Sequence, residues 1–219
     1  MTTPSLFEVY FDFDNTLTRY DVLDAIIRDF SVDDEWQRIE ADWDAGRIGS
    51  RECLELQFAR VRVTEAALSD YLSRIKVDPA LPDLLDFLRS KEIEPVILSD
   101  SCDWIIRRIL TANGLGPLPI FANEITFDGD RPLISFPYFA SICTRCGNCK
   151  TSHLMQRNRP PGTRKVYVGD GRSDICPAGF CEVLFAKDSL LRHYSPLRPD
   201  CIPFDSLEMV LNHLKSLIP

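Results

Sequence analysis

FEVYFDFDNT, residues 7–16, is an apolar run that ends in two carboxylates, Asp12 and Asp14. A run of this kind predicts a buried strand over Phe7–Phe13. Two carboxylates that close an apolar strand repel each other unless a cation lies between them. The segment therefore predicts both a core strand and a cation-dependent site at the end of that strand.

Residues 20–78 show a different pattern, in which apolar side chains recur at helical spacing. The repeating positions are Val22, Ile26 and Phe30, then Leu54, Phe58 and Val61, and then Leu68, Leu72 and Ile75. A turn signal at residues 78–79 ends the pattern. We therefore expect a helical domain at 20–78, inserted into a core domain made of residues 1–19 and 79–219.

Beyond residue 78, predicted strands alternate with predicted helices. The strands lie at 95–98, 120–127, 133–136, 166–168 and 183–185, and the helices at 81–90, 104–110, 150–156 and 207–217. Asp128 and Gly129 form a hairpin signal, and in the helical segment Ser50 and Thr64 are predicted N-caps. The alternation indicates an α/β fold, an open parallel sheet covered by helices on both faces.

Polar side chains stand at or just beyond the ends of three of the predicted strands. They are Asp12, Asp14, Ser99 and Asp170, with Asp174 one turn after the last. Because ligands of open α/β sheets bind beyond the carboxyl ends of the strands, we expect these side chains to meet in one crevice. Lys150, at the start of a predicted helix, would supply a cation there.

Four segments resemble the four motifs of the haloacid dehalogenase superfamily, in the same order. They are DFDNT at 12–16, Ser99 after an apolar strand, Lys150, and GDGRSD at 169–174. The match spans nearly the whole chain. The helical segment between the first two motifs resembles the cap of subclass IB, which includes phosphoserine phosphatase. The resemblance implies a Rossmann-like core with a small helical-bundle cap of the C1 type.

The resemblance also implies a phosphatase that forms a phosphorylated aspartate. Asp12 would be the nucleophile and Asp14 the general acid and then the general base. Ser99 and backbone amides would hold the phosphoryl oxygens, while Lys150 would neutralise charge. An acid at position 14 favours hydrolysis, since the superfamily's ion-pumping ATPases have threonine there. A phosphomutase and a catalytically inactive binding protein of the same fold are the alternatives.

Mg²⁺ is the cofactor that the resemblance implies. The metal would bind the carboxylates of Asp12 and Asp170 and the backbone carbonyl of Asp14, and Asp174 would support the metal shell. Carboxylate, carbonyl and phosphate oxygens suit the octahedral shell that Mg²⁺ prefers.

Five residues are candidates for substrate binding: Thr16, Asp21, Gln57, Asp100 and Ser101. Gln57 aligns near the position where phosphoserine phosphatases carry a cap arginine, which disfavours phosphoserine because its carboxylate needs a cation. Asp21 and Asp100 would attract a cationic head such as ethanolamine. The alternative for Asp100 is that it caps the helix beginning near Cys102.

Two groups of relatives compete on local resemblance. Residues 46–52 and 183–188 resemble the methionine-salvage phosphatase, which acts on a hydroxy-keto-methylthiopentenyl phosphate. Residues 98–100, the cysteine run before Lys150 and residues 167–177 resemble the phosphoethanolamine/phosphocholine phosphatases. A small phosphorylated metabolite is therefore the expected partner.

Composition limits the other partners. The formal net charge is −8, which disfavours nucleic acid and anionic membranes as main partners. The N-terminus does not resemble a signal peptide, and no apolar run approaches the ~18 residues needed to span a bilayer. We expect a cytoplasmic protein with reduced cysteines. Oligomeric state is left open.

Eight cysteines are present, three of them at close spacing before Lys150. Cys143, Cys146 and Cys149 are compatible with a metal site, with disulfide formation on oxidation, or with free thiols. His153 and Cys102 are the candidate fourth ligands. Oxidation here is expected to disturb the neighbouring lysine.

Overall fold

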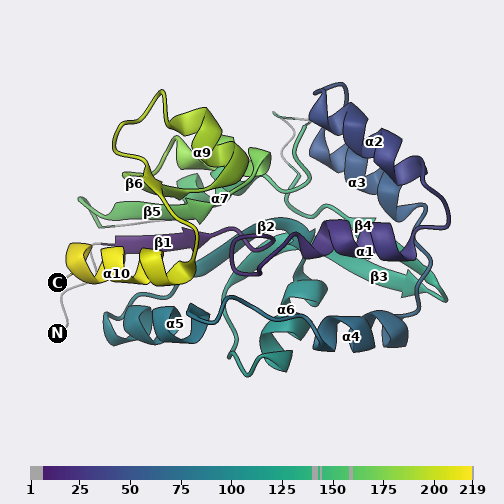
Figure 1. Ribbon diagram of the computed structural model, residues 1–219, viewed down its shortest axis with the longest axis horizontal. Helices are drawn as coiled ribbons and strands as arrows, with labels where there is room; N and C mark the ends of the chain where they lie inside the picture. Colours follow the sequence, from purple (N-terminus) through teal and green to yellow (C-terminus); the bar gives the residue numbers. More distant parts are fainter. Residues whose placement is uncertain (1–6, 140–142, 144, 158–159, 219) are drawn as a thin grey trace.

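A seven-stranded sheet runs through the centre of the computed structural model (Figure 1), which describes residues 7–139, 143, 145–157 and 160–218. The strand order is β4-β3-β2-β1-β5-β6-β7. The strands are β1 (Phe7–Phe11), β2 (Val96–Cys102), β3 (Ile120–Asp128), β4 (Arg131–Ser135), β5 (Arg164–Gly169), β6 (Val183–Ala186) and β7 (Ile202–Pro203). The predicted α/β class is confirmed.

β1 lies in the middle of the sheet because its residues are apolar on both faces. Val9, Tyr10 and Phe11 are fully or almost fully buried, and β1 pairs in parallel with both β2 and β5. A parallel strand covered on both sides needs such a run. The strand ends at Phe11 rather than at the predicted Phe13.

The predicted hairpin forms one edge of the sheet. β3 and β4 pair antiparallel across the predicted turn, where Gly129 has a φ of +64°. This hairpin makes the sheet mixed rather than wholly parallel. β7 was not predicted because two residues carry too little periodicity.

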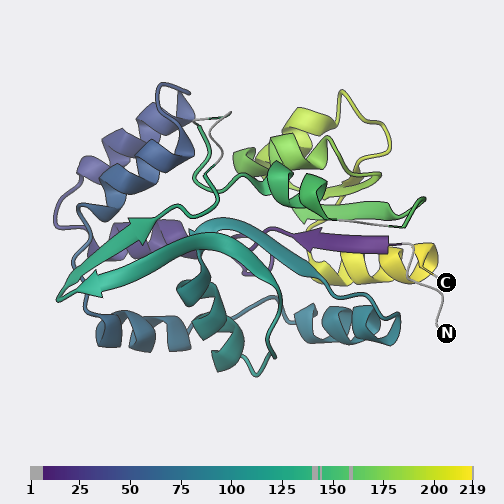
Figure 2. The ribbon, with the colours of Figure 1, turned by 180° about the vertical axis from the view of Figure 1, so that it is seen from behind.

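Helices cover both faces of the sheet (Figures 1 and 2). The predicted helical segment contains α1 (Val22–Phe30), α2 (Glu35–Asp44), α3 (Ser50–Phe58) and α4 (Glu65–Ser73). The later helices are α5 (Leu81–Ser90), α6 (Asp103–Ala112), α7 (Lys150–Gln156), α8 (Ile175–Ala178), α9 (Asp188–Tyr194) and α10 (Leu207–Leu217). α5, α7 and α10 match their predicted bounds, whereas α8 and α9 were not predicted. Among the described residues, no helix is long and apolar enough to span a membrane.

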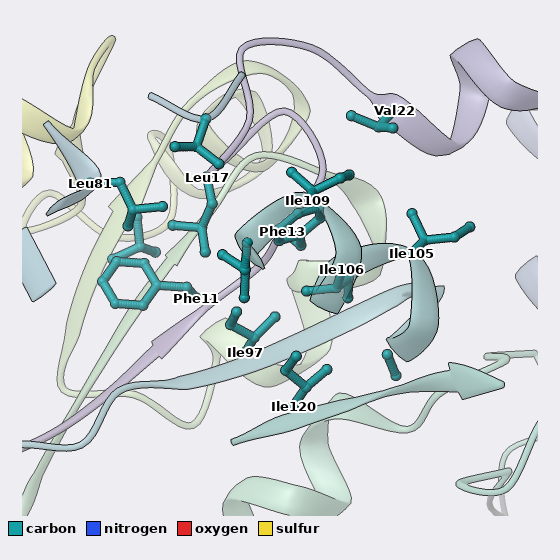
Figure 3. Packing of buried hydrophobic residues seen from close by; sticks show 14 of the residues in the cluster. Phe11, Phe13, Leu17, Val22, Leu81, Ile97, Ile105, Ile106, Ile109 and Ile120 are labelled. Carbon is teal, nitrogen blue, oxygen red and sulfur yellow. The ribbon is translucent and has the colours of Figure 1, made fainter. Parts of the chain in front are cut away.

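Two buried clusters occupy the two faces of the sheet. The larger one joins Phe11 and Ile97 to α5, α6 and α10, and Figure 3 shows its centre. The smaller one joins Tyr10 and Tyr167 to α7 and α9. The larger cluster continues through Val22 into α1 and α4, so the helical segment shares its core with the sheet. The division at 20 and 78 remains a prediction.

One of the two predicted helix N-caps is confirmed and the other is wrong. The Thr64 side chain caps α4 by accepting from Ala67 N–H at 3.3 Å, as predicted. Ser50 is not an N-cap: Gly49 takes that position and Ser50 is the first residue of α3. A Cβ at Gly49 would lie 2.5 Å from the carbonyl oxygen of Arg145, so tertiary contact requires glycine there.

Candidate active site

The carboxyl ends of β1, β2 and β5 meet at a cavity of about 130 Å³, on the side toward which α2 and α3 lie in Figure 1. The side from the sheet contributes Asp12, Asp14, Ser99, Asp100, Ser101, Asp170, Gly171, Arg172 and Ser173. The side from the helical segment contributes Asp21, Leu23, Asp24, Glu40, Trp43, Ser50, Cys53, Leu54 and Gln57. The structure thus brings most of the predicted site residues to one crevice.

Lys150 lies beneath this cavity, between two carboxylates. Its Nζ donates to Asp12 Oδ1 at 2.6 Å and to Asp174 Oδ1 at 2.7 Å, and its side chain is 1% exposed. Burial alone would lower the pKa of Lys150, but these carboxylates raise it above its ordinary value. Burial raises the pKa of Asp12 well above its ordinary value, against the opposing effect of Lys150. The lysine is therefore a charged group buried between Asp12 and Asp174.

Asp174 organises the loop after β5. Its Oδ2 accepts from the N–H groups of Asp170 at 3.1 Å and Gly171 at 3.0 Å. Its Oδ1 accepts from the Tyr167 hydroxyl at 2.7 Å as well as from Lys150. A Cβ at position 169 would lie 2.5 Å from Asp174 Oδ2. The glycine before Asp170 is therefore needed for this close approach.

Asp170 is held by the segment that follows β1. Thr16 Oγ1 donates to its Oδ1 at 2.9 Å, and Asn15 Nδ2 donates to its Oδ2 at 2.8 Å. Burial is the main cause that raises the pKa of Asp170, and the charge of Asp174 adds to it. Thr16 was expected to bind substrate, but it is buried against Asp170 and is not among the residues that line the cavity. Its contact is that of a residue that orients a carboxylate.

The acids form a potential metal site. Asp12, Asp170 and Asp174 each present a carboxylate oxygen, and the three oxygens lie within 4.8 Å of one another. Such a set of oxygen donors suits Mg²⁺. Since burial and mutual repulsion raise the pKa values of Asp12 and Asp170, a divalent cation would relieve an electrostatic cost already present.

The cysteines before Lys150 form no comparable site. Within the described part of the chain, the acid triad is the group found with metal-binding geometry. Cys143, Cys146 and Cys149 are free thiols. Cys143 and Cys146 interact through their side chains. Burial is the main cause that raises the pKa of Cys146 to about 12.

Asp14 lies in the turn after β1, lines the cavity, and reaches the N-terminus of α1 with its side chain. Its Oδ1 accepts from the N–H groups of Val22 at 3.0 Å and Leu23 at 3.3 Å. Burial and then the neighbouring Asp21 raise the pKa of Asp14 well above its ordinary value, although the two backbone bonds oppose this. The raised pKa favours the protonated form of Asp14, in which the carboxyl group can donate a proton.

Asn148 was missed by sequence reasoning. Its Nδ2 donates to the carbonyl oxygens of Ser99 at 2.9 Å and Phe121 at 2.7 Å, and its Oδ1 lies 2.8 Å from His153 Nε2. Burial lowers the pKa of His153 to about 4, so the ring is neutral. Asn148 thereby fixes the start of α7, and with it Lys150, to β2. An asparagine between cysteines gives no signal of this role in one sequence.

Asp100 is held by neighbouring groups. Its Oδ1 accepts from Asn148 N–H at 3.2 Å, and the Ser50 hydroxyl hydrogen-bonds to its carboxylate. The suggestion that Asp100 caps the helix near Cys102 is wrong, because α6 begins at Asp103 without a side-chain cap. β2 instead continues through Cys102, past the predicted end at residue 98.

The helical segment adds acids that the sequence did not single out. Asp24 and Glu40 line the cavity with Asp21. Burial is the main cause that raises the pKa of Asp21 to about 7, and the charge of Asp24 adds to it. Burial is also the main cause that raises the pKa of Asp24 to about 7, and the charge of Glu40 adds to it. Gln57 is buried beside them and accepts from Cys53 Sγ at 3.5 Å. This part of the cavity lining is acidic.

Comparison with known proteins agrees with this geometry. The model of the family described as Putative Phosphatase matches residues 7–190. A 2-hydroxy-3-keto-5-methylthiopentenyl-1-phosphate phosphatase from Geobacillus thermodenitrificans is 29% identical, over 95% of this chain and 96% of that protein. Probable phosphatase phospho1 from Danio rerio is 28% identical, over 98% of this chain and 87% of the other.

Solved structures share the fold. A phosphoserine phosphatase, solved as a phospho-aspartyl intermediate analogue, superposes with a TM-score of 0.69 at 20% identity, covering 94% of this chain and 97% of that one. The predicted Rossmann-like fold of the haloacid dehalogenase superfamily is thereby confirmed. The chain therefore belongs to the Putative Phosphatase family and is a phosphoric monoester hydrolase with the haloacid dehalogenase fold.

Proposed function

We propose that the protein is a Mg²⁺-dependent phosphatase that hydrolyses a small phosphate monoester through phosphorylation of Asp12. The observation that carries the proposal is the position of Lys150, buried between Asp12 and Asp174 with Asp170 beside them. A phosphate dianion repels an attacking carboxylate, so the site must first neutralise its charge. Lys150 and a divalent cation together meet that requirement.

The residues suggest how the reaction proceeds. An oxygen of Asp12 attacks phosphorus, and the bond from phosphorus to the ester oxygen breaks. Asp14 donates its proton to the departing oxygen, and then removes a proton from the water that attacks the aspartyl phosphate. Inorganic phosphate leaves and Asp12 is regenerated. Lys150 stays charged throughout.

Mg²⁺ would be held by the carboxylates of Asp12 and Asp170 and by the backbone carbonyl of Asp14. When bound, it supplies positive charge for the phosphoryl oxygens. Both oxygens of Asp174 already accept hydrogen bonds from the loop, Tyr167 and Lys150. We therefore assign Asp174 to the support of the loop and of Lys150.

Ser99 and Ser101 would bind the phosphoryl group or the substrate next to it. Both are buried at the cavity, and the Ser101 side chain interacts with the Asp14 carboxyl group. Their position beside the proposed catalytic acids supports this assignment.

The direct test is hydrolysis of p-nitrophenyl phosphate with and without Mg²⁺. Asp12→Asn is expected to lose activity by a factor of at least about 10³, because the nucleophile is removed. Asp86→Asn is the matched control, since Asp86 is an exposed carboxylate paired with Arg89 on α5. Magnesium-independent hydrolysis, or an active Asp12→Asn enzyme, would contradict the mechanism. A requirement for a phosphorylated sugar activator would favour the phosphomutase alternative.

For the substrate we propose a phosphate monoester that carries an amine or quaternary ammonium group. Asp21, Asp24 and Glu40 line the same cavity as the reacting acids. Burial and mutual repulsion raise their pKa values, and a bound cation would oppose that repulsion, which supports the proposal. Gln57 beside them is neutral, which does not suit a substrate carboxylate.

Competition between substrate classes tests this proposal. Phosphoethanolamine is expected to be preferred over an uncharged phosphate ester of similar size, and Asp24→Asn should reduce that preference about tenfold at neutral pH. Asp100→Asn is expected to have a smaller effect, because Ser50 and Asn148 already bind Asp100. Preference for the hydroxy-keto-methylthiopentenyl phosphate named for the Geobacillus relative would contradict the cationic class.

A further inference from the structure

An arginine from the loop that carries Asp170 lies against the helical segment. Arg172 Nη1 donates to the carbonyl oxygen of Asp44 at 2.5 Å and lies 3.4 Å from that of Trp43. Its guanidinium carbon is 5.0 Å from the centroid of the Trp43 ring, a cation–π distance. The ion pair with the Asp44 carboxylate, at 3.4 Å, is exposed and contributes little. The contacts to the α2 backbone and the indole matter most.

The same indole has a second anchor. Trp43 Nε1 donates to Ser50 Oγ at 3.1 Å, and the Ser50 hydroxyl in turn hydrogen-bonds to the Asp100 carboxylate. Trp43 is therefore connected both to the loop after β5 and to the end of β2. These are the two parts of the sheet that carry the proposed catalytic groups Asp170 and Ser99.

The position of Trp43 determines one wall of the cavity. Trp43 and Glu40 are one turn apart on α2, so they share a face of the helix, and both line the cavity. α2 has no basic residue in its last turn. Cations at its C-terminal end therefore come from outside the helix, where they interact favourably with the helix dipole. Arg47 provides one from within the helical segment, and Arg172 provides the one that faces the cavity.

We infer that Arg172 is a positioning residue: it holds Trp43, and with it the α2 wall of the cavity, against the loop that carries Asp170. Its kinetic consequence rests on the proposed phosphatase function, whereas its structural consequence does not. Without the guanidinium group, α2 loses its contact with the loop, and a substrate loses the wall formed by Trp43 and Glu40. Asp12, Asp14 and Lys150 keep their own contacts.

The structural test uses the fluorescence of Trp43. Replacing Trp36 and Trp104 by phenylalanine leaves Trp43 as the single tryptophan of the chain. In that background Arg172→Ala is expected to shift the emission to longer wavelength and to increase quenching by acrylamide. Arg172→Lys should restore part of the signal, because lysine keeps the charge but not the planar group.

Arg47→Ala is the matched control. Arg47 lies at the same end of α2, is 61% exposed, and pairs with Asp42 within the helical segment. It is not among the described residues that line the cavity. If Arg172 only stabilised the helix end, the two alanine variants would shift the emission equally, and the inference would be wrong. No shift in Arg172→Ala would overturn it as well.

The kinetic test uses the substrate that gives the best kcat/KM. Arg172→Ala is expected to raise KM about tenfold with kcat within about twofold, as expected for lost binding that is equal in ground and transition states. A fall in kcat at constant KM would place Arg172 among the reacting groups and overturn the positioning role. Unchanged KM despite a shifted emission would also overturn it. An inactive wild-type enzyme would contradict the phosphatase proposal, while the fluorescence comparison would still decide the inference.

Discussion

At the scale of single residues, the site depends on a buried positive charge. Lys150 is enclosed by Asp12, Asp174 and Ser173, at 2.6, 2.7 and 3.0 Å. Taking such charges out of water is costly unless each is paired and hydrogen-bonded. Here one ammonium group compensates two carboxylates, one of which is the proposed nucleophile. Fold and chemistry therefore depend on the same contact.

Lys150→Met is expected to destabilise the protein by roughly 3 kcal/mol, because it leaves two buried carboxylates without their cation. Activity should fall by a factor of about 10² to 10³, the usual effect of removing one group that stabilises transition-state charge. Thermal unfolding and p-nitrophenyl phosphate hydrolysis measure the two effects. Lys165→Met is the control, since Lys165 bonds to the Phe180 carbonyl away from the cavity. Wild-type activity in Lys150→Met would contradict the assigned role.

At the scale of elements, short connections place the catalytic groups. The loop after β5 is shaped by Gly169 and by the four hydrogen bonds that Asp174 accepts. The loop before α7 is fixed to β2 by Asn148 and contacts the helical segment through Arg145, whose carbonyl accepts from Arg51 N–H at 3.3 Å. A change in this second loop is expected to reach Lys150, the first residue of α7.

Oxidation provides a test of that loop. Peroxide would convert the Cys143 and Cys146 thiols to a disulfide with release of two waters. The pKa of Cys146, raised to about 12 chiefly by burial, keeps this thiol protonated at neutral pH, so its own thiolate is scarce there. We expect slow loss of activity in peroxide at pH 7, restored by dithiothreitol and absent in Cys143→Ser. Cys201→Ser should behave as wild type. Unchanged activity throughout would contradict a link between this loop and Lys150.

At the scale of the whole molecule, negative charge is concentrated at the cavity. The chain has a formal net charge of −8, and the carboxyl groups of Asp12, Asp21, Asp24, Glu40 and Asp170 line the same cavity. Such an arrangement opposes folding when the carboxylates are ionised and favours binding of cations. The stability of the protein without a bound cation is therefore expected to depend on pH.

The sign follows from the raised pKa values. The folded protein binds more protons than the unfolded chain between the ordinary carboxyl pKa and about 7, so stability decreases as pH rises through that window. Without metal, Tm should be lower at pH 8 than at pH 6. Asp24 is exposed and also faces Glu40, Asp14, Asp44 and Arg28. Asp24→Asn should therefore reduce the difference by only about 1–2 °C.

Asp29→Asn is the control for this measurement. Asp29 lies on the same helix, but Arg28 holds its pKa below the ordinary value, so its contribution has the opposite sign. This variant should not reduce the loss of stability between pH 6 and pH 8. A wild-type Tm that rises over this interval would contradict the electrostatic account of the cavity.

The sequence determined those features that depend on local pattern. The apolar run before Asp12 specified a strand buried on both faces, and helical periodicity and turn signals located α5, α7, α10 and the β3–β4 hairpin. Polar residues at the ends of predicted strands made Asp12, Asp14, Ser99 and Asp170 candidate site residues, and these predictions depend on neighbours within a few residues. Lys150 was a candidate only through the order of the four motifs along the chain.

Tertiary structure decided the rest, because the contacts involved join residues far apart in the chain. Arg172 meets Trp43 across 129 positions, and Thr16 meets Asp170 across 154. Gly49 replaced Ser50 as the N-cap because the backbone of Arg145 packs against it. Asn148, Asp24 and Glu40 gained their roles in the same way. No local pattern encodes such contacts, since they exist only once the sheet and the helical segment have packed together.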